Sequence, residues 1–195
     1  MSNTPEHLGG HLNRTNTDEP LLKYIQERFK TTSMLDIGCG PGGMKQVANN
    51  MNIDWYGVDG DTTVIENTDY SLVHDFTLGE ATIVKEFDLV WCTEFLEHVE
   101  EKYIPNYMPL FEKGKMAVVT AAPPGWPGHH HVNCREESYW VDVFKNYGLR
   151  YNEELTNEFK SLSQMRKNFF KRAGMVFLKW TFRQQTNPAH NQALI

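Results

Sequence analysis

Residues 34–43 read Met-Leu-Asp-Ile-Gly-Cys-Gly-Pro-Gly-Gly, an apolar run that passes through one carboxylate into a glycine-rich loop. Glycine lets a backbone turn sharply and approach a ligand closely, because no side chain stands in the way. The stretch therefore predicts a buried strand followed by a ligand-binding turn. Gly38, Gly40 and Gly43 also satisfy the G-x-G-x-x-G pattern of dinucleotide-binding proteins, which is a weak signal by itself.

Asp36 separates the two kinds of ligand that such a loop binds. A carboxylate two residues before the first glycine repels a pyrophosphate, whereas it suits a cofactor with a cationic amino acid group. With this carboxylate, the stretch resembles motif I of the class I S-adenosylmethionine-dependent methyltransferases, and the chain is identified as a member of that family. The resemblance implies S-adenosylmethionine as cofactor, with contacts from Asp36, Gly38, Cys39 and Gly40.

Length and composition fit one globular domain. The chain has 195 residues, of which 40% are hydrophobic and 23% charged, as in ordinary globular proteins with a substantial core. No apolar run approaches the roughly 20 residues of a membrane span, and the N-terminus has no secretory signal pattern. Cys39, Cys92 and Cys134 form no C-x-x-C pair, so we expect neither disulfides nor a zinc knuckle, and a cytoplasmic location.

Strand and helix patterns alternate along the chain, which predicts βαβ units in an α/β fold. We expect strands at Ser33–Ile37, Trp55–Asp59, Tyr70–His74, Phe87–Cys92, Lys115–Ala121 and Met175–Phe182. We expect helices over about 19–30, after Gly43, around Glu94–Met108, across Glu136–Tyr147 and over Phe159–Ala173.

The family resemblance covers about residues 20–183. It implies a doubly wound, mostly parallel seven-stranded sheet with helices on both faces, a Rossmann-like methyltransferase fold whose last strand is antiparallel. Residues 1–195 then form a single methyltransferase domain, in which residues 1–20 are an arm or lid and 184–195 a flexible tail.

Two further carboxylates stand where predicted strands end. Asp59, followed by Gly60, comes 19 residues after Gly40, near the spacing of an acid that binds ribose hydroxyls. A carboxylate accepts two charge-assisted hydrogen bonds from a vicinal diol. The resemblance implies that Asp75 accepts a hydrogen bond from the adenine amino group and that the Phe76 N–H meets a ring nitrogen.

The fourth predicted strand and the arm supply the other cofactor contacts. Residues 87–93 look like family motif IV, which implies that backbone carbonyls near Cys92 and Thr93 face the ammonium of the methionine part. Arg14 is a candidate for binding the cofactor's carboxylate in a bidentate fork.

Glu94, Glu97 and His98 follow motif IV at the spacing i, i+3 and i+4, which places them on one face of the predicted helix. One interpretation is a divalent cation, Mg or Mn, bound by these three residues and by His131 of a later triple-histidine loop. The other is His98 as general base, oriented by a glutamate, with a rate that rises between about pH 6 and 7. The sequence leaves both open.

The family offers several precedents for this arrangement. Small-RNA 3′-terminal 2′-O-methyltransferases share the Glu-x-x-Glu-His pattern and the later His, and use them to hold a metal at the ribose. Similar Glu-His pairs occur in ubiquinone-pathway and saccharide O-methyltransferases. We therefore expect a hydroxyl acceptor, with His98, Glu94 and His131 as catalytic residues and Trp126 as a candidate wall of the acceptor pocket.

The distribution of charge along the chain bears on the class of methyl acceptor. The net charge is −6, while residues 145–195 carry nine Lys and Arg against three acidic residues. The acidic body favours O-methylation of a small molecule or saccharide, and the basic end supports the alternative of a metal-dependent RNA ribose 2′-O-methyltransferase. A nicotinamide-dependent oxidoreductase and a catalytically silent binding module are further alternatives, of which Asp36 argues against the former.

Overall fold

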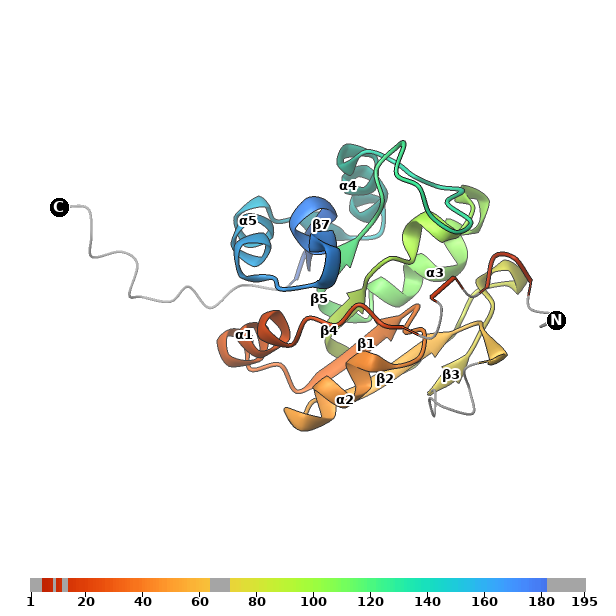
Figure 1. Ribbon diagram of the computed structural model, residues 1–195. Helices are drawn as coiled ribbons and strands as arrows, with labels where there is room; N and C mark the ends of the chain where they lie inside the picture. Colours follow the sequence, from red (N-terminus) through yellow and green to blue (C-terminus); the bar gives the residue numbers. More distant parts are fainter. Residues whose placement is uncertain (1–4, 9, 12–13, 64–70, 182–195) are drawn as a thin grey trace.

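The computed structural model describes residues 5–8, 10–11, 14–63 and 71–181. A seven-stranded sheet runs through the molecule in the order β3-β2-β1-β4-β5-β7-β6 (Figure 1). Its strands are β1 (Ser33–Ile37), β2 (Asp54–Asp59), β3 (Leu72–Val73), β4 (Phe87–Cys92), β5 (Gly114–Thr120), β6 (Leu149–Tyr151) and β7 (Gly174–Lys179). Only β7 runs antiparallel to its neighbours β5 and β6. The predicted α/β fold is confirmed.

Helices cover both faces of the sheet. They are α1 (Glu19–Phe29), α2 (Gly43–Asn50), α3 (Ile104–Phe111), α4 (Glu137–Asn146), α5 (Glu153–Leu162) and α6 (Phe169–Ala173). Short 3-10 turns are η2 (Phe76–Leu78), η3 (Leu96–His98), η4 (Glu101–Tyr103) and η5 (Arg166–Asn168). Among the described residues no helix is long and apolar enough to span a bilayer.

Adjacent strand residues point to opposite faces, and the core therefore has two layers. Met34 packs in the layer under α1, α2, α5 and α6, whereas its neighbour Leu35 packs in the layer under α3 and α4. Both side chains are fully buried. Burial of both faces explains why the parallel strands read as continuous apolar runs rather than as an alternation.

The helix predicted around Glu94–Met108 is wrong in its first half. Glu94 has a left-handed φ of 55°, and its N–H bonds to the Thr120 hydroxyl rather than joining a helix. The Glu97 carbonyl accepts the N–H groups of Val132 and Asn133 at 3.0 Å. These long-range partners replace the helical ones, and a helix begins only at Ile104.

The single helix predicted over Phe159–Ala173 is also wrong, since the chain leaves α5 after Leu162 and re-enters a helix at Phe169. Strand β6 was not predicted, because three residues are too short for a periodicity signal. Strands β2, β5 and β7 begin one residue earlier than expected, and β3 is reduced to two residues. Tyr70, Phe182 and the predicted tail 184–195 lie outside the described residues.

Asp18 explains the break after α5. Its carboxylate is 1% exposed and caps α1 by accepting the Leu21 N–H at 3.3 Å. It also accepts the N–H groups of Gln164 at 3.1 Å and Met165 at 3.2 Å, and the Ser163 hydroxyl. One buried carboxylate thus fixes both the start of α1 and the turn that leads into η5.

We expect Asp18→Ala to lower the free energy of unfolding by about 2–4 kcal/mol, because a helix cap is lost and buried donors are left unpaired. Urea unfolding measures the change. Glu19→Ala, at the exposed first position of the same helix, serves as the control and should change it by less than about 0.5 kcal/mol. A loss no larger than the control's would contradict this role.

Candidate functional site

A cavity of about 530 Å³ opens beyond the carboxyl ends of the parallel strands. It lies where the chain order reverses between β1 and β4, the position at which open α/β sheets bind ligands. We call it the strand-end cavity. Its walls come from the loops after β1 to β4, the N-terminal arm, the loop over 126–131 and the turn at η5.

The glycine loop is built by backbone geometry. Gly38 and Gly40 have φ values of 69° and 50°, and a Cβ on Gly38 would lie 2.5 Å from the Phe95 ring. Asp59 fixes this loop, because its Oδ2 accepts the Gly40 N–H at 2.8 Å while its Oδ1 accepts the Asp61 N–H at 2.9 Å. The carboxylate at the end of β2 therefore holds the loop that follows β1.

Asp36 borders the cavity although its side chain is almost fully buried, with 3% of the residue exposed. Its Oδ2 accepts a hydrogen bond from Trp55 Nε1 at 3.0 Å. Burial, offset only in part by that hydrogen bond, raises the pKa of Asp36 to about 7, and the nearby Asp59 adds to the rise. A cation in the cavity would stabilise the ionised form.

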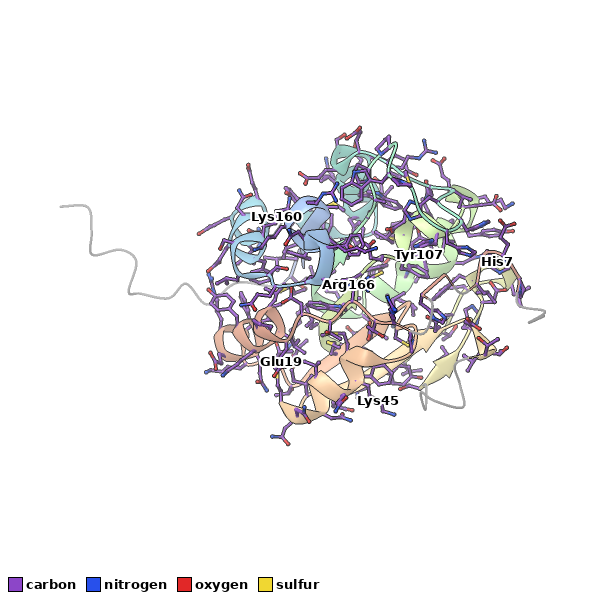
Figure 2. All side chains as sticks on the ribbon, in the orientation of Figure 1. His7, Glu19, Lys45, Tyr107, Lys160 and Arg166 are labelled. Atoms are coloured by element: carbon purple, nitrogen blue, oxygen red, sulfur yellow. The ribbon has the colours of Figure 1, made fainter. Side chains whose placement is uncertain are left out.

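The N-terminal arm lies against the strand ends. His7 Nε2 is 2.9 Å from Asp75 Oδ2, and His11 Nε2 is 2.9 Å from Asp61 Oδ2. The arm also joins the triple-histidine loop, where His129 Nε2 donates to the Glu6 carbonyl at 2.8 Å. Figure 2 labels His7 beside the loops at the end of the sheet. Asp75, expected at an adenine ring, is thus paired with the arm in this structure.

Most of the residues proposed from the sequence line this one cavity. They are Arg14, Asp36, Gly38, Cys39, Gly40, Asp59, Gly60, Asp75, Phe76, Thr93, Glu94, His98 and His131, together with the expected wall residue Trp126. Cys92 does not line it, because the β4 residue is fully enclosed in the core. Glu97 does not line it either and lies behind the wall.

Sequence reasoning missed several lining residues, namely His7, His11, Met44, His74, Phe95, Arg166, Lys167 and Phe169. The two arm histidines, four positions apart, were the available signal. Their acidic partners Asp75 and Asp61 are 68 and 50 residues away in the chain. Only the folded sheet brings them together.

Three of the four predicted metal ligands cluster. Ligand atoms of Glu97, His98 and His131 all lie within 4.8 Å of one another. His98 Nδ1 is 2.8 Å from the His129 carbonyl, and His131 Nδ1 is 3.0 Å from the Trp126 carbonyl. Because a carbonyl only accepts, each Nδ1 donates, and Nε2 is the nitrogen that offers a lone pair when the ring is neutral.

Glu97 is the unusual member of this cluster. It is fully buried, and among the described residues neither carboxylate oxygen makes a hydrogen bond of good geometry, although the backbone N–H groups of Glu97 and Ala122 are near enough to stabilise its ionised form. Burial, and then the nearby Glu94, raise its pKa well above the ordinary value. Glu94 itself is not part of the cluster, since the Thr120 hydroxyl donates to its Oε1 at 2.8 Å.

His98 is held in its neutral form. Burial, and then the neighbouring His131, lower the pKa of His98 to about 4. Its imidazole is therefore a free base throughout the neutral range. The sequence predicts an unperturbed histidine that titrates between pH 6 and 7. Burial and the packing against His131 lower its pKa below that range.

Comparisons with known proteins agree with this geometry. Residues 35–107, from β1 to α3, match a family model described as a methyltransferase domain. A search of curated proteins gave no match.

Solved structures with the same fold include a TehB-like SAM-dependent methyltransferase from Corynebacterium glutamicum, 18% identical with a TM-score of 0.60, covering 83% of this chain and 86% of that one. The methyltransferase domain of bacterial CtHen1-C is 16% identical with a TM-score of 0.57, covering 83% and 96%. Magnesium protoporphyrin IX methyltransferase from Synechocystis PCC 6803, with bound SAM, is 13% identical with a TM-score of 0.56, covering 82% and 77%.

The matched segment contains the glycine loop, Asp36, Asp59 and the turn after β4, which form part of the cavity wall. The fold of the whole described chain is that of the compared methyltransferases. Residues 35–107 thus match a methyltransferase domain, and the chain has a methyltransferase fold.

Proposed function

We propose that this enzyme methylates a hydroxyl oxygen of a small-molecule acceptor bound in the strand-end cavity. The observation that carries the proposal is that the neutral imidazole of His98 borders the same cavity as Asp36 and Asp59. When bound, S-adenosylmethionine supplies an electrophilic methyl group and leaves as S-adenosylhomocysteine. The protein must then position the acceptor in line and take up its proton.

The cofactor contacts follow from the positions of the charges. Asp36 faces the ammonium, and the guanidinium of Arg14 binds the carboxylate. Both Asp59 oxygens already accept a backbone N–H, but each has a further lone pair for a ribose hydroxyl. Asp75 accepts the adenine amino group once His7 gives up its bond to that carboxylate.

His98 is the proposed proton acceptor. Its Nδ1–H is bound to the His129 carbonyl, which fixes the tautomer and leaves Nε2 for the acceptor's hydroxyl proton. As the new C–O bond forms, the proton moves from the hydroxyl oxygen to Nε2. The basic form needs no prior deprotonation at neutral pH, because the pKa of the imidazole is already low.

A second candidate is the metal-dependent ribose 2′-O-methyltransferase, which the Glu97, His98 and His131 cluster favours. The cluster fits a divalent cation, because it brings the buried carboxylate of Glu97 together with ring nitrogens of His98 and His131. Carbonyl acceptors on Nδ1 are typical of metal-binding histidines. A cation held there would polarise the acceptor hydroxyl.

Asp59→Ala should weaken binding of S-adenosylhomocysteine by about 1.5–3 kcal/mol, because charge-assisted hydrogen bonds and the support of the glycine loop are lost. Titration calorimetry measures the affinity. Asp54→Ala, at the exposed start of the same strand, should bind as the wild type does. Unchanged affinity in folded Asp59→Ala protein would remove this carboxylate from the cofactor site.

Asp36→Asn should change the pH dependence of the free energy of unfolding and should weaken the binding of S-adenosylhomocysteine. A buried carboxyl with a raised pKa stabilises the fold when protonated, and that stability is lost as pH rises from about 4 to about 7. Relative to Asp36→Asn, the wild type should lose up to about 1.4 kcal/mol of unfolding free energy per pH unit in this window. Urea unfolding at pH 5, 6 and 7 measures it, with Asp54→Asn as control.

The same Asp36→Asn protein should bind S-adenosylhomocysteine about tenfold or more weakly at pH 7.5, because the ammonium loses its counter-charge. Parallel stability curves for wild type and variant, or undiminished affinity, would contradict the assigned role.

His98→Ala should reduce turnover by about 10²- to 10⁴-fold while affinity for S-adenosylhomocysteine is kept.

Calorimetry with Mn²⁺ separates the two candidates. The metal-dependent candidate is supported if chelator-treated, calcium-free wild-type protein binds Mn²⁺ tightly. Glu97→Gln should then lose this binding, and the exposed control Glu100→Gln should keep it. Activity unaffected by EDTA leaves the proton-acceptor role alone. Full turnover in His98→Ala would refute both.

A further inference from the structure

We propose that the acceptor carries an anionic group, a carboxylate or a phosphate, bound by Arg166 and Lys167 at the mouth of the strand-end cavity and flanked by Arg172. This inference rests on the proposed function and names its substrate class.

The basic residues are at the cavity and lack acidic partners. Arg166 and Lys167 line the cavity, and Figure 2 places Arg166 between the C-terminal elements and the N-terminal segment. Within the described ranges, no carboxylate lies in ion-pair distance of Arg166, Lys167 or Arg172, whereas Arg28, Lys85, Lys115 and Arg135 each have an acidic partner. Lys167 and Arg172 do lower the pKa of Glu94, against the larger effect of burial.

The turn that carries these cations is fixed in advance. Asp18 binds the N–H groups of Gln164 and Met165 immediately before it, and Phe170, fully buried, anchors the chain after it. Lys167 itself has a left-handed φ of 55°, which is unfavourable for a residue with a Cβ and persists only where surrounding contacts impose it. Such preorganisation is typical of a binding site and unnecessary for a solvated basic surface.

Trp126 connects the basic turn with the histidine pair. Its ring stacks on the Arg172 guanidinium, with 3.8 Å from Cζ to the ring centroid. Its carbonyl accepts the Nδ1–H of His131 at 3.0 Å. Arg172 is therefore linked through Trp126 to His131, whose ring lies 4.9 Å from that of His98, and we place the anionic group of the acceptor on this side of the cavity.

The volume of the cavity limits the size of the acceptor. One enclosed volume of about 530 Å³ must hold the cofactor as well as the acceptor's reacting part, and Arg14 already serves the cofactor's carboxylate. The remaining cations and the Trp126 ring suit a planar, anionic hydroxy compound.

The test uses full-length protein saturated with S-adenosylhomocysteine and three phenols that differ in one substituent: 4-hydroxybenzoate, 4-hydroxyphenyl phosphate and 4-hydroxybenzamide. Calorimetry should show at least about tenfold tighter binding of one anionic phenol than of the amide. R166Q/K167Q should weaken that anion about 10- to 100-fold, with the amide and S-adenosylhomocysteine unchanged. Lys171→Gln, an exposed cation on α6 outside the cavity, is the matched control and should behave as wild type. The two anionic arms distinguish carboxylate from phosphate.

Other outcomes overturn the proposal. These are no binding of any phenol, equal affinity for the amide, a loss confined to S-adenosylhomocysteine, or a loss confined to a single-stranded ribo-oligonucleotide whose binding falls steeply with salt. Failure of the proposed function is distinguishable. If the wild type does not bind S-adenosylhomocysteine, the cofactor site at Asp36 and Asp59 is wrong. Anion binding is also measured without cofactor, so it tests Arg166 and Lys167 independently.

Discussion

The hydrogen bond from the Gly40 N–H to Asp59 is the contact on which the site depends. It ties the loop after β1 to the end of β2, while the Gly38 N–H donates to the Val58 carbonyl at 2.9 Å in the same seam. With the loop held open in this way, Asp36 is enclosed at the floor of the cavity. The resulting burial raises the pKa of Asp36, and a cationic ligand in the cavity would favour its ionised form.

The cavity divides by charge. Asp36, Asp59 and Asp75 line it near the ends of β1, β2 and β3, and Arg166 and Lys167 line it from η5. The N-terminal arm is bound to carboxylates through His7 and His11. In our proposal the carboxylates bind the cofactor and the cations bind an anionic acceptor.

Local sequence patterns predicted the parallel strands well, because residues such as Met34 and Leu35 are buried on both faces and leave an uninterrupted apolar run. They failed where distant partners override helical spacing. The Thr120 hydroxyl accepts the N–H of Glu94, and the Asp18 carboxylate accepts the N–H of the residue after Ser163. Two predicted helices are therefore interrupted. Helical spacing grouped Glu94 with Glu97 and His98, whereas the structure groups Glu97 and His98 with His131 and leaves Glu94 outside that cluster.

The sequence by itself determined the α/β fold, the glycine loop and the carboxylates Asp36 and Asp59, because these depend on residue types at short spacings. Tertiary structure decided which side chains meet and in which protonation state. Glu97 is fully buried beside His98 and His131. The pKa of His98 falls to about 4 through burial and then through His131. Lys167 lines the same cavity as the loops of the N-terminal half. Burial and long-range contact set these properties, and neither is encoded in spacing along the chain.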